Sequence, residues 1–208
     1  MPKSLFIYSI FYGGMVCIAG VLGNKQVALG PLAIEAGIFP FLMLVITSSA
    51  VAELHGKKIA DQLVRFGFIP LVASILLTLF VLWLPPAKEM DPARLSAFDT
   101  VLGQSPRLMI AGIISYGTSQ TLNIYVFERL RSGMGKLVWL RGALAAVLSQ
   151  VIDTLLFVTI SFYGIFPIAE LLAGQMIAKI TLSLLLVPFV IQFMIWLARK
   201  LDQSAPTA

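Results

Sequence analysis

Two stretches of the chain place polar side chains in otherwise apolar surroundings. SQTLNIYVF at residues 119–127 and SQVIDTLLF at residues 149–157 both read Ser-Gln-x-(Leu/Ile)-(Asn/Asp)-x-x-x-Phe. Within each copy the serine and the Asn or Asp lie four residues apart, so a helix presents them on one face. A hydroxyl, an amide and a carboxylate gathered there could bind a polar ligand. They could also join one helix to another.

The composition predicts an integral membrane protein. Of the 208 residues, 59% are hydrophobic and 12% are charged, whereas a soluble domain carries about 25% charged residues. So few charges could not cover a core of this size in water. The stretches between apolar segments are too short for a second domain, so residues 1–208 are expected to form one all-α transmembrane domain. The apolar run after Lys3 has no small-residue cleavage pattern and is expected to be a retained helix.

Six segments are long and apolar enough to cross a bilayer, which takes about 17–25 residues. The segment Val27–Ile34 is also apolar and could re-enter the membrane or extend a helix. The longest connection, LPPAKEMDPARLSAFDTVLGQSP, is expected to be an ordinary solvated loop. Three spans in each half are compatible with a 3+3 inverted repeat, although the visible sequence repeat lies within one half. The six segments are 5–23, 36–54, 67–85, 107–127, 138–163 and 171–198.

Lysine and arginine are unevenly divided between the two sides of these spans, with ten on one side and four on the other. The positive-inside rule therefore predicts that both termini lie in the cytoplasm, as in a multi-pass protein of the bacterial inner membrane. The net charge of +5 follows from this topology and gives no reason to expect nucleic-acid binding. The ten residues are Lys3, Lys57, Lys58, Arg65, Arg129, Arg131, Lys136, Arg141, Arg199 and Lys200, and the four are Lys25, Lys88, Arg94 and Arg107.

Ionisable and amide side chains at mid-membrane depth form the candidate site. Asp153 lies roughly 18 Å along its helix from the inner side, and Lys179 is about as deep from the outer side. Gln120 and Gln150 lie roughly 20 Å from the outer side and roughly 14 Å from the inner side, so they should meet at one depth. Such residues usually face the bundle interior and serve a function. We therefore predict a ligand pocket formed by Gln120, Asn123, Gln150 and Asp153.

Other polar residues are weaker candidates for the same pocket. Ser119 and Ser149 belong to the type that more often bonds helix to helix. Lys179 either neutralises Asp153 or contacts the substrate. The remaining candidates are a small polar residue in the second span, an acid near the inner interface and an arginine at a helix end, namely Ser49, Glu53 and Arg107.

Residue counts exclude several classes of chemistry. The single cysteine, Cys17, excludes a disulfide framework, and the single histidine, His55, excludes a multi-histidine metal cluster. The sequence also lacks a nucleophile elbow and an acidic phosphotransferase motif. We therefore expect no enzymatic activity, no bound metal and no cofactor.

The polar segments resemble those of a known transporter family. FPF at 39–41, ELHGKK at 53–58, SQTLNIYVFERLR at 119–131 and SQVIDTLLF at 149–157 occur in the order and approximate spacing of the queuosine precursor transporters, together with Arg107, Leu140, Arg141, Lys179 and Pro188. This family was earlier grouped with vitamin uptake transporters. The resemblance extends over most of the chain. It implies six membrane helices and uptake of the 7-deazaguanine bases preQ0, a nitrile, and preQ1, an aminomethyl base.

The resemblance also implies roles for individual positions. The family usually has Asp where this chain has Asn123, and commonly has Asp in the second helix where this chain has Ser49. A pocket with two fewer acids is expected to favour neutral preQ0 or free queuine over cationic preQ1. The positions that match the family are Arg107, Gln120, Arg141, Gln150, Asp153 and Lys179.

Two modes of transport fit these observations. The chain could work alone by alternating access, with its substrate bound near the midplane. Alternatively, it could be the substrate-binding subunit of a multicomponent vitamin or nucleobase uptake system, which copurifying ATPase subunits would reveal. Energy coupling stays open, because Asp153 or Glu53 could carry a proton whereas a facilitator needs no ion. Membrane lipids are expected neighbours, and the many small residues are compatible with a homodimer.

Overall fold

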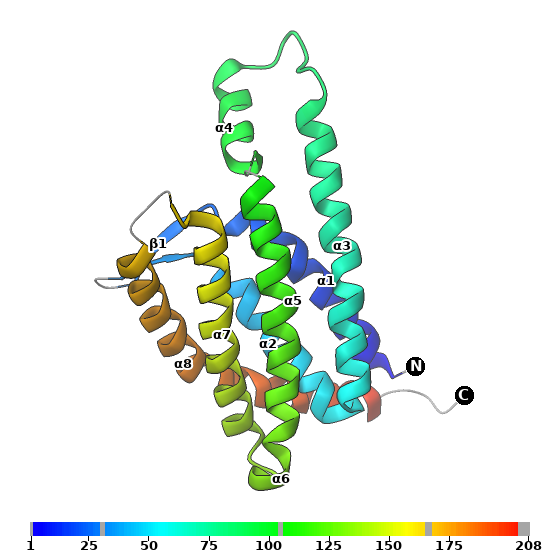
Figure 1. Cartoon of the computed structure of the whole chain (residues 1–208). Coiled ribbons are helices and arrows are strands. Elements are labelled where there is room, and N and C mark those ends of the chain that lie inside the picture. The colour runs from blue at the N-terminus through cyan, green and yellow to red at the C-terminus, as the bar shows by residue number, and fades with distance from the viewer. Residues whose placement is uncertain (1, 30–31, 104–105, 165–167, 204–208) are drawn as a thin grey trace.

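Six long helices make up most of the part of the chain that the structure describes (Figure 1). The computed structural model describes residues 2–29, 32–103, 106–164 and 168–203. Two short helices and an antiparallel hairpin connect the long helices, so the predicted all-α class holds with a small hairpin added. The long helices are α1 (Lys3–Leu22), α2 (Ile38–His55), α3 (Lys57–Trp83), α5 (Pro106–Arg129), α7 (Val138–Phe162) and α8 (Ile168–Gln203), and the short elements are α4 (Pro92–Leu102), α6 (Arg131–Met134), β1 (Gln26–Leu29) and β2 (Leu32–Glu35).

The outer surface of the bundle is apolar, as expected of a multi-pass membrane protein. Within the described ranges, α1, α2, α3, α7 and α8 from Leu172 onward are long and apolar enough to cross a bilayer. Large apolar side chains such as Phe66 and Phe189 are more than half exposed, and soluble monomers rarely expose large patches of this kind. The segment 107–127, expected to be the fourth of six spans, forms α5, which is not among these five helices.

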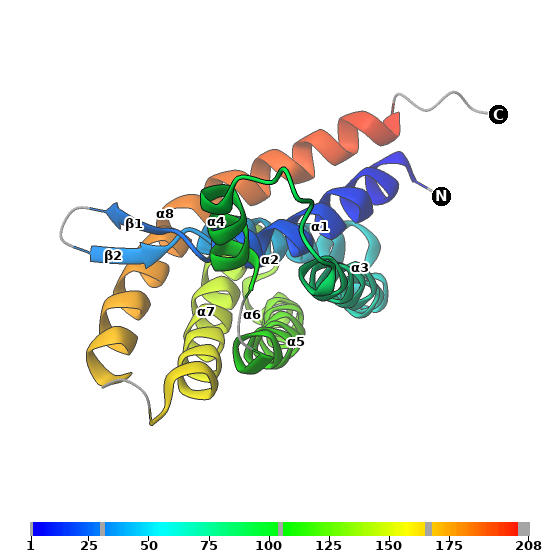
Figure 2. The same cartoon turned by 90° about the horizontal axis from the view of Figure 1, so that it is seen from above.

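The two ends of the bundle carry different elements. The hairpin and α4 lie at one end, whereas α6 and the α2–α3 junction lie toward the other (Figure 1). Seen from above, α1 runs beside the second half of α8, so that the start of α1 lies near the end of α8 (Figure 2). Tyr8 donates a hydrogen bond to the carbonyl of Met194, and Ser4 bonds Asp202. These contacts join the first and last helices of the chain.

Of the apolar segment 27–34, residues 27–29 lie in β1 and residues 32–34 lie in β2, so the described part of this segment does not extend a helix. Gln26 pairs with Glu35 at the open end of the hairpin, and the two strands are antiparallel. Each strand is rich in apolar residues, and a Gly-Pro dipeptide stands between them in the sequence, which is a turn signal. The hairpin matters for the site because it carries Glu35.

The long connection after the third span contains a helix and is not a solvated loop throughout. Pro92 begins α4, and Asp91 accepts a hydrogen bond from the N–H of Ala93 at 3.2 Å. An acid at the N-cap followed by proline is a favourable helix start, because the carboxylate satisfies a free N–H and proline has none to satisfy.

Two predicted spans are longer in the structure. α3 begins at Lys57, directly after Gly56 and well before the expected start at residue 67. Gly56 has φ = 85°, a left-handed conformation that glycine adopts without strain, so α2 and α3 can follow each other across a tight turn. α8 ends at Gln203 and changes direction along its length (Figure 2). Its interior Pro188 accounts for a bend, because proline lacks an N–H and its ring clashes with the preceding turn.

Candidate functional site

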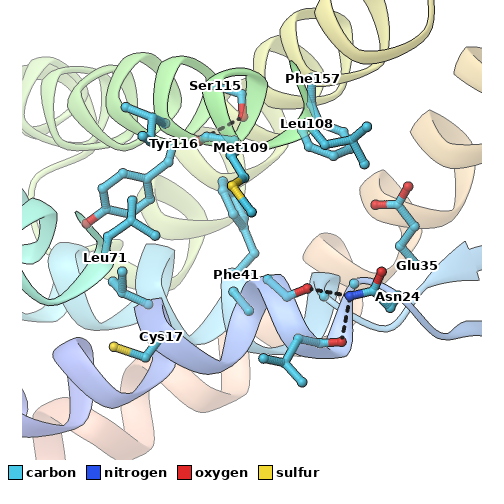
Figure 3. A pocket seen from close by; sticks show the side chains of 18 of the residues that line it. Cys17, Asn24, Glu35, Phe41, Leu71, Leu108, Met109, Ser115, Tyr116 and Phe157 are labelled. Carbon is cyan, nitrogen blue, oxygen red and sulfur yellow. Dashed lines mark hydrogen bonds between the residues drawn. The ribbon is translucent and has the colours of Figure 1, made fainter. Parts of the chain in front are cut away.

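A cavity of about 290 Å³ lies in the part of the bundle nearest the hairpin and α4, and all six long helices contribute to its wall. Figure 3 shows aromatic and aliphatic side chains, among them Phe41 and Phe157, around an open space. Among the described residues, the charged members of the lining are Glu35, Asp153 and Lys179. A mostly apolar cavity with a few converging polar groups is the usual form of a small-molecule site.

Asp153 and Lys179 form an ion pair in the wall of this cavity. Nζ of Lys179 lies 3.5 Å from Oδ2 of Asp153, and the two side chains are 8% and 10% exposed respectively. The hydroxyl of Ser119 donates to Oδ1 of Asp153, also at 3.5 Å. Charge-assisted hydrogen bonds are usually 2.7–2.9 Å long. The pair is therefore loose, and both groups keep hydrogen-bonding capacity for a ligand.

Glu35 brings a second carboxylate to the cavity. It stands at the end of β2, and its side chain points into the open space in Figure 3. One oxygen, Oε1, accepts a hydrogen bond from Nε2 of Gln175 in α8 at 3.2 Å. Burial raises the pKa of the Glu35 carboxyl, and the nearby Lys179 charge and the Gln175 hydrogen bond offset this only in part. The cavity thus holds two acids and one base.

A layer of hydrogen bonds closes the bundle next to the cavity on the side toward α6. Tyr116 lines the cavity, and its hydroxyl donates to that of Tyr12 at 3.0 Å. Gln120 lies about one turn further along α5. Its Oε1 accepts hydrogen bonds from Tyr12 at 3.5 Å and from Ser48 at 3.4 Å. Side chains from α1, α2 and α5 therefore meet here, and Tyr12, Ser48 and Gln120 are all buried.

Asn123 extends the same layer by one more turn of α5. Its Nδ2 donates to Oγ of Ser49 at 3.0 Å, to Oγ of Ser48 at 3.1 Å and to the carbonyl of Val45 at 3.2 Å. Asn123, Ser48 and Ser49 are all 0% exposed. Gln120, Asn123 and Ser49, which were predicted to face a ligand, thus join α5 to α2 and do not line the cavity.

The other predicted residues of helices α5 and α7 also lie outside the cavity lining. Ser149 donates to the carbonyl of Ala146 in its own helix at 3.0 Å. Gln150 is buried, and neither its amide nitrogen nor its oxygen has a hydrogen-bond partner in the described part of the chain. Arg107, at the start of α5, donates through Nη2 to the carbonyl of Tyr163 at 2.9 Å. It thereby satisfies a free carbonyl at the C-terminal end of α7.

A fully buried arginine joins four segments nearer to α6. Nη1 of Arg141 lies 3.0 Å from Oε2 of Glu53 and donates to the carbonyl of Gly135 at 3.1 Å. Its Nε donates to the carbonyl of Phe127 at 3.2 Å, and its guanidinium lies over the Phe127 ring at 4.1 Å. Glu128 contributes a more distant oxygen, 3.9 Å from Nη2. Glu53, predicted as a ligand, therefore pairs with Arg141 away from the cavity.

Comparison with known proteins identifies the family of the chain. The model of the family described as "Putative vitamin uptake transporter" matches residues 35–193. The chain belongs to this family. It is 26% identical to the "Probable queuosine precursor transporter" of Bacillus subtilis (strain 168) over 185 residues, which cover 86% of this chain and 80% of that protein. It is 23% identical to the "Queuosine precursor transporter" of Escherichia coli (strain K12) over 163 residues, which cover 77% and 70%. No solved structure matches it significantly.

Membership of the vitamin uptake transporter family confirms the resemblance noted in the sequence and the prediction of a transporter rather than an enzyme. Within this transporter, Lys179 and Ser119 each lie 3.5 Å from a carboxylate oxygen of Asp153, and Asp153 and Lys179 line the cavity whereas Ser119 does not. Glu35 is not among the residues predicted from the sequence to form the site. The signal was present, because Glu35 follows Leu-Ala-Ile and precedes Ala-Gly-Ile-Phe, and an acid in so apolar a run needs a partner.

Proposed function

We propose that the chain imports queuosine precursors, the 7-deazaguanine bases preQ0 and preQ1 and also queuine, across the bacterial inner membrane. The observation that carries the proposal is the ion pair between Asp153 and Lys179 in the wall of a mostly apolar cavity. Two relatives that bear the name queuosine precursor transporter support it. A cavity of about 290 Å³ is near the lower limit for small-molecule sites, which suits a bicyclic base.

The chemistry of the two charged groups matches the edge of a 7-deazaguanine. Its N1–H and 2-amino groups are donors that one carboxylate can accept together, and its O6 is an acceptor for an ammonium. Asp153 would take the two donors while Lys179 donates to O6. Because the ammonium and the carboxylate are 3.5 Å apart, the hydrogen bond between them is weak, and a base that enters between them gives up little when it replaces that bond. A buried site of this kind strongly rejects analogues that lack the matching group, because its own polar atoms would stay unpaired.

Transport by alternating access fits the position of the cavity. The cavity lies toward the hairpin and α4, and the hydrogen bonds of Gln120 and Asn123 close the bundle toward α6. If both termini are cytoplasmic, this is a conformation with its cavity on the outer side. The layer around Gln120 would have to open to release substrate inward. Binding near the midplane with a closed layer on one side is the arrangement expected of such transporters.

We further propose that α5 is the sixth membrane span. Ile110, Ile114 and Tyr125 are exposed along one side of it. Ser119, Gln120 and Asn123 on the same helix are 0% exposed, whereas Thr118 and Thr121 are exposed. A helix with apolar residues outward and polar residues inward suits a lipid environment, where polar groups face the bundle interior. The N-in orientation, the inverted repeat and the homodimer stay predictions.

An uptake experiment tests the proposed function. A queuosine-auxotrophic bacterium that lacks its own transporter would receive nanomolar preQ0, preQ1 or queuine, and queuosine in its tRNA would be measured. The wild-type chain should restore queuosine, and Asp153→Asn should abolish restoration at equal membrane expression. Asp99→Asn makes the same chemical change at an exposed position of α4 and should leave uptake unchanged.

The possible failures of this experiment have different meanings. No restoration by well-expressed wild type with any base would refute the proposed function. Restoration by Asp153→Asn would keep the function but leave Asp153 a structural role. If uptake occurs only with copurifying ATPase subunits, the chain is a substrate-binding subunit of a multicomponent system.

A further inference from the structure

The charges that line the cavity do not balance. Glu35, Asp153 and Lys179 are its charged groups within the described residues, so the ionised cavity carries one net negative charge. The ammonium of Lys179 lies 3.5 Å from Asp153, and these two charges offset each other. Among the described residues, the hydrogen-bond donor to Glu35 is the neutral amide of Gln175. A partly buried carboxylate in a membrane protein is costly without a cation or a proton.

The position of Glu35 makes it available to a ligand. Only its Oε1 accepts the hydrogen bond from Gln175, and the carboxylate points into the open space in Figure 3. It comes from the hairpin, whereas Asp153 and Lys179 come from α7 and α8. A molecule bound between Asp153 and Lys179 through one edge therefore presents its other substituents to a different element of the wall.

We propose that Glu35 is a specificity-determining residue that binds a primary ammonium group on the substrate and so makes the transporter select a cationic aminomethyl base over a neutral nitrile base. This inference rests on the proposed function. The cation neutralises the remaining charge of the cavity, and a carboxylate–ammonium bond is a charge-assisted hydrogen bond, about twice as strong as a neutral one. A nitrile has no proton to donate and leaves the carboxylate unpaired.

This proposal replaces the expectation that the site favours neutral preQ0. That expectation assumed that Asn123 and Ser49, where related chains have acids, belong to the pocket. In the structure these two residues hydrogen-bond each other at 3.0 Å and do not line the cavity. The replacement of two acids by Asn123 and Ser49 therefore does not change the charge of the cavity. Glu35 supplies an acid there instead.

Protons compete with the substrate for Glu35. Its pKa is raised above that of an ordinary carboxyl, mainly by burial. Below this pKa Glu35 is neutral and cannot pair with an ammonium, so the ratio of cationic-base uptake to neutral-base uptake must fall as the external pH falls through it. The groups that share the cavity with Glu35 are Asp153 and Lys179, which are paired, and the thiol of Cys17 and the phenol of Tyr116.

The test compares preQ1 with preQ0 in the auxotrophic strain, for wild type and Glu35→Gln, by the base concentration that half-restores queuosine in tRNA. We expect wild type to need about tenfold less preQ1 than preQ0. Glu35→Gln should raise the preQ1 requirement about tenfold and change the preQ0 requirement less than about twofold, as expected for loss of one charged hydrogen bond. Glu89→Gln, an exposed control between α3 and α4, should change neither value.

Two further measurements keep the test decisive if Glu35→Gln is poorly inserted. Glu35→Asp keeps the charge and should keep the preference for preQ1. In wild type, lowering the external pH should reduce the ratio of preQ1 to preQ0 uptake. Equal requirements for the two bases in wild type, or equal loss of both in Glu35→Gln, would overturn the role of Glu35 while uptake itself is retained. Uptake of neither base by wild type would refute the proposed function.

Discussion

Neutralising the two members of the Asp153–Lys179 pair, singly and together, gives the most direct test of the site. At 3.5 Å, two unit charges attract by about 5 kcal/mol at an effective dielectric of about 20. Solvent screens them little, because both side chains are 10% exposed or less. Removing one partner of a buried pair typically costs about 3–5 kcal/mol, since it leaves the other charge uncompensated. Asp153→Asn and Lys179→Gln should each lower the free energy of unfolding by about that amount.

The double variant separates stability from transport. Because it leaves no unpaired charge, Asp153→Asn with Lys179→Gln should be more stable than either single variant. It should nevertheless fail to import any base, because neither the acceptor pair nor the ammonium donor remains. Unfolding of the purified protein in detergent would give the free energies, and queuosine in tRNA would give the uptake. Ser119→Ala removes only the hydroxyl that donates to Asp153, and it should cost about 0.5–1.5 kcal/mol.

Two outcomes would refute this reasoning. If the losses of the two single variants simply add in the double variant, the 3.5 Å pair contributes no coupling energy. If the double variant imports bases at the wild-type rate, the pair is structural and the substrate binds elsewhere.

Three further predictions use other parts of the bundle. Cys17 lines the cavity, so maleimide should label this single cysteine in wild type, and a transported base should slow the labelling; labelling that is insensitive to every base would place binding elsewhere. Glu53→Gln removes the acid that lies 3.0 Å from the fully buried Arg141, and it should lower the free energy of unfolding by about 3–5 kcal/mol. Adding Arg141→Met removes the unpaired charge, so the loss should be smaller in the double variant. Gln150→Met removes two buried polar atoms that have no partner in the described ranges, and it should raise the free energy of unfolding by about 1–3 kcal/mol. An unchanged or lower value would show that Gln150 is hydrogen-bonded.

The long apolar segments made the helices predictable, and local turn chemistry explains most of the differences. Five of the predicted spans correspond to helices that are apolar enough to cross a bilayer. The segment Val27–Ile34 was open between a re-entrant loop and a helix because eight apolar residues have no decisive period. Asp91 and Pro92 are a clear helix start inside the longest connection, but a polar composition favoured a loop. Helix length at α3 depended on Gly56, whose φ cannot be read from its neighbours.

The depth of the site residues along their helices could be predicted from the sequence, but the direction in which each side chain points could not. Distances along the helices placed Asp153 and Lys179 at one level, and they are paired in the structure. They could not say which neighbour each residue of α5 faces. Successive residues of a helix point about 100° apart, so Ser119 reaches Asp153 in α7 while Gln120 reaches α1 and α2. The sequence repeat suggested that both copies face one pocket. In the structure, Asp153 belongs to the wall of the cavity, whereas Gln120 belongs to a contact between helices.

The contacts of α5 indicate which helices would move together during transport. α5 and α7 are joined at three levels, by Arg107 at one end, by Ser119 and Asp153 in the middle, and by Arg141 at the other end. A pair held along its whole length should move as one body.

The hydrogen bonds of α5 with α1 and α2 join neutral groups, and those of Asn123 to α2 are 3.0–3.2 Å long, whereas those of Gln120 are longer. Gln120 meets these helices through neutral hydrogen bonds of 3.4–3.5 Å, each worth about 0.5–1.5 kcal/mol. Its own Nε2 has no partner among the described residues and could take a new one after a small shift. The costly step in separating α5 and α7 from α1 and α2 is then the bond between Arg141 and Glu53. If α5 and α7 separate from α2 as the bundle opens inward, Arg141 loses Glu53 and needs another partner. Glu128 lies 3.9 Å from Arg141 and belongs to α5, so it would move together with Arg141 and could take that place.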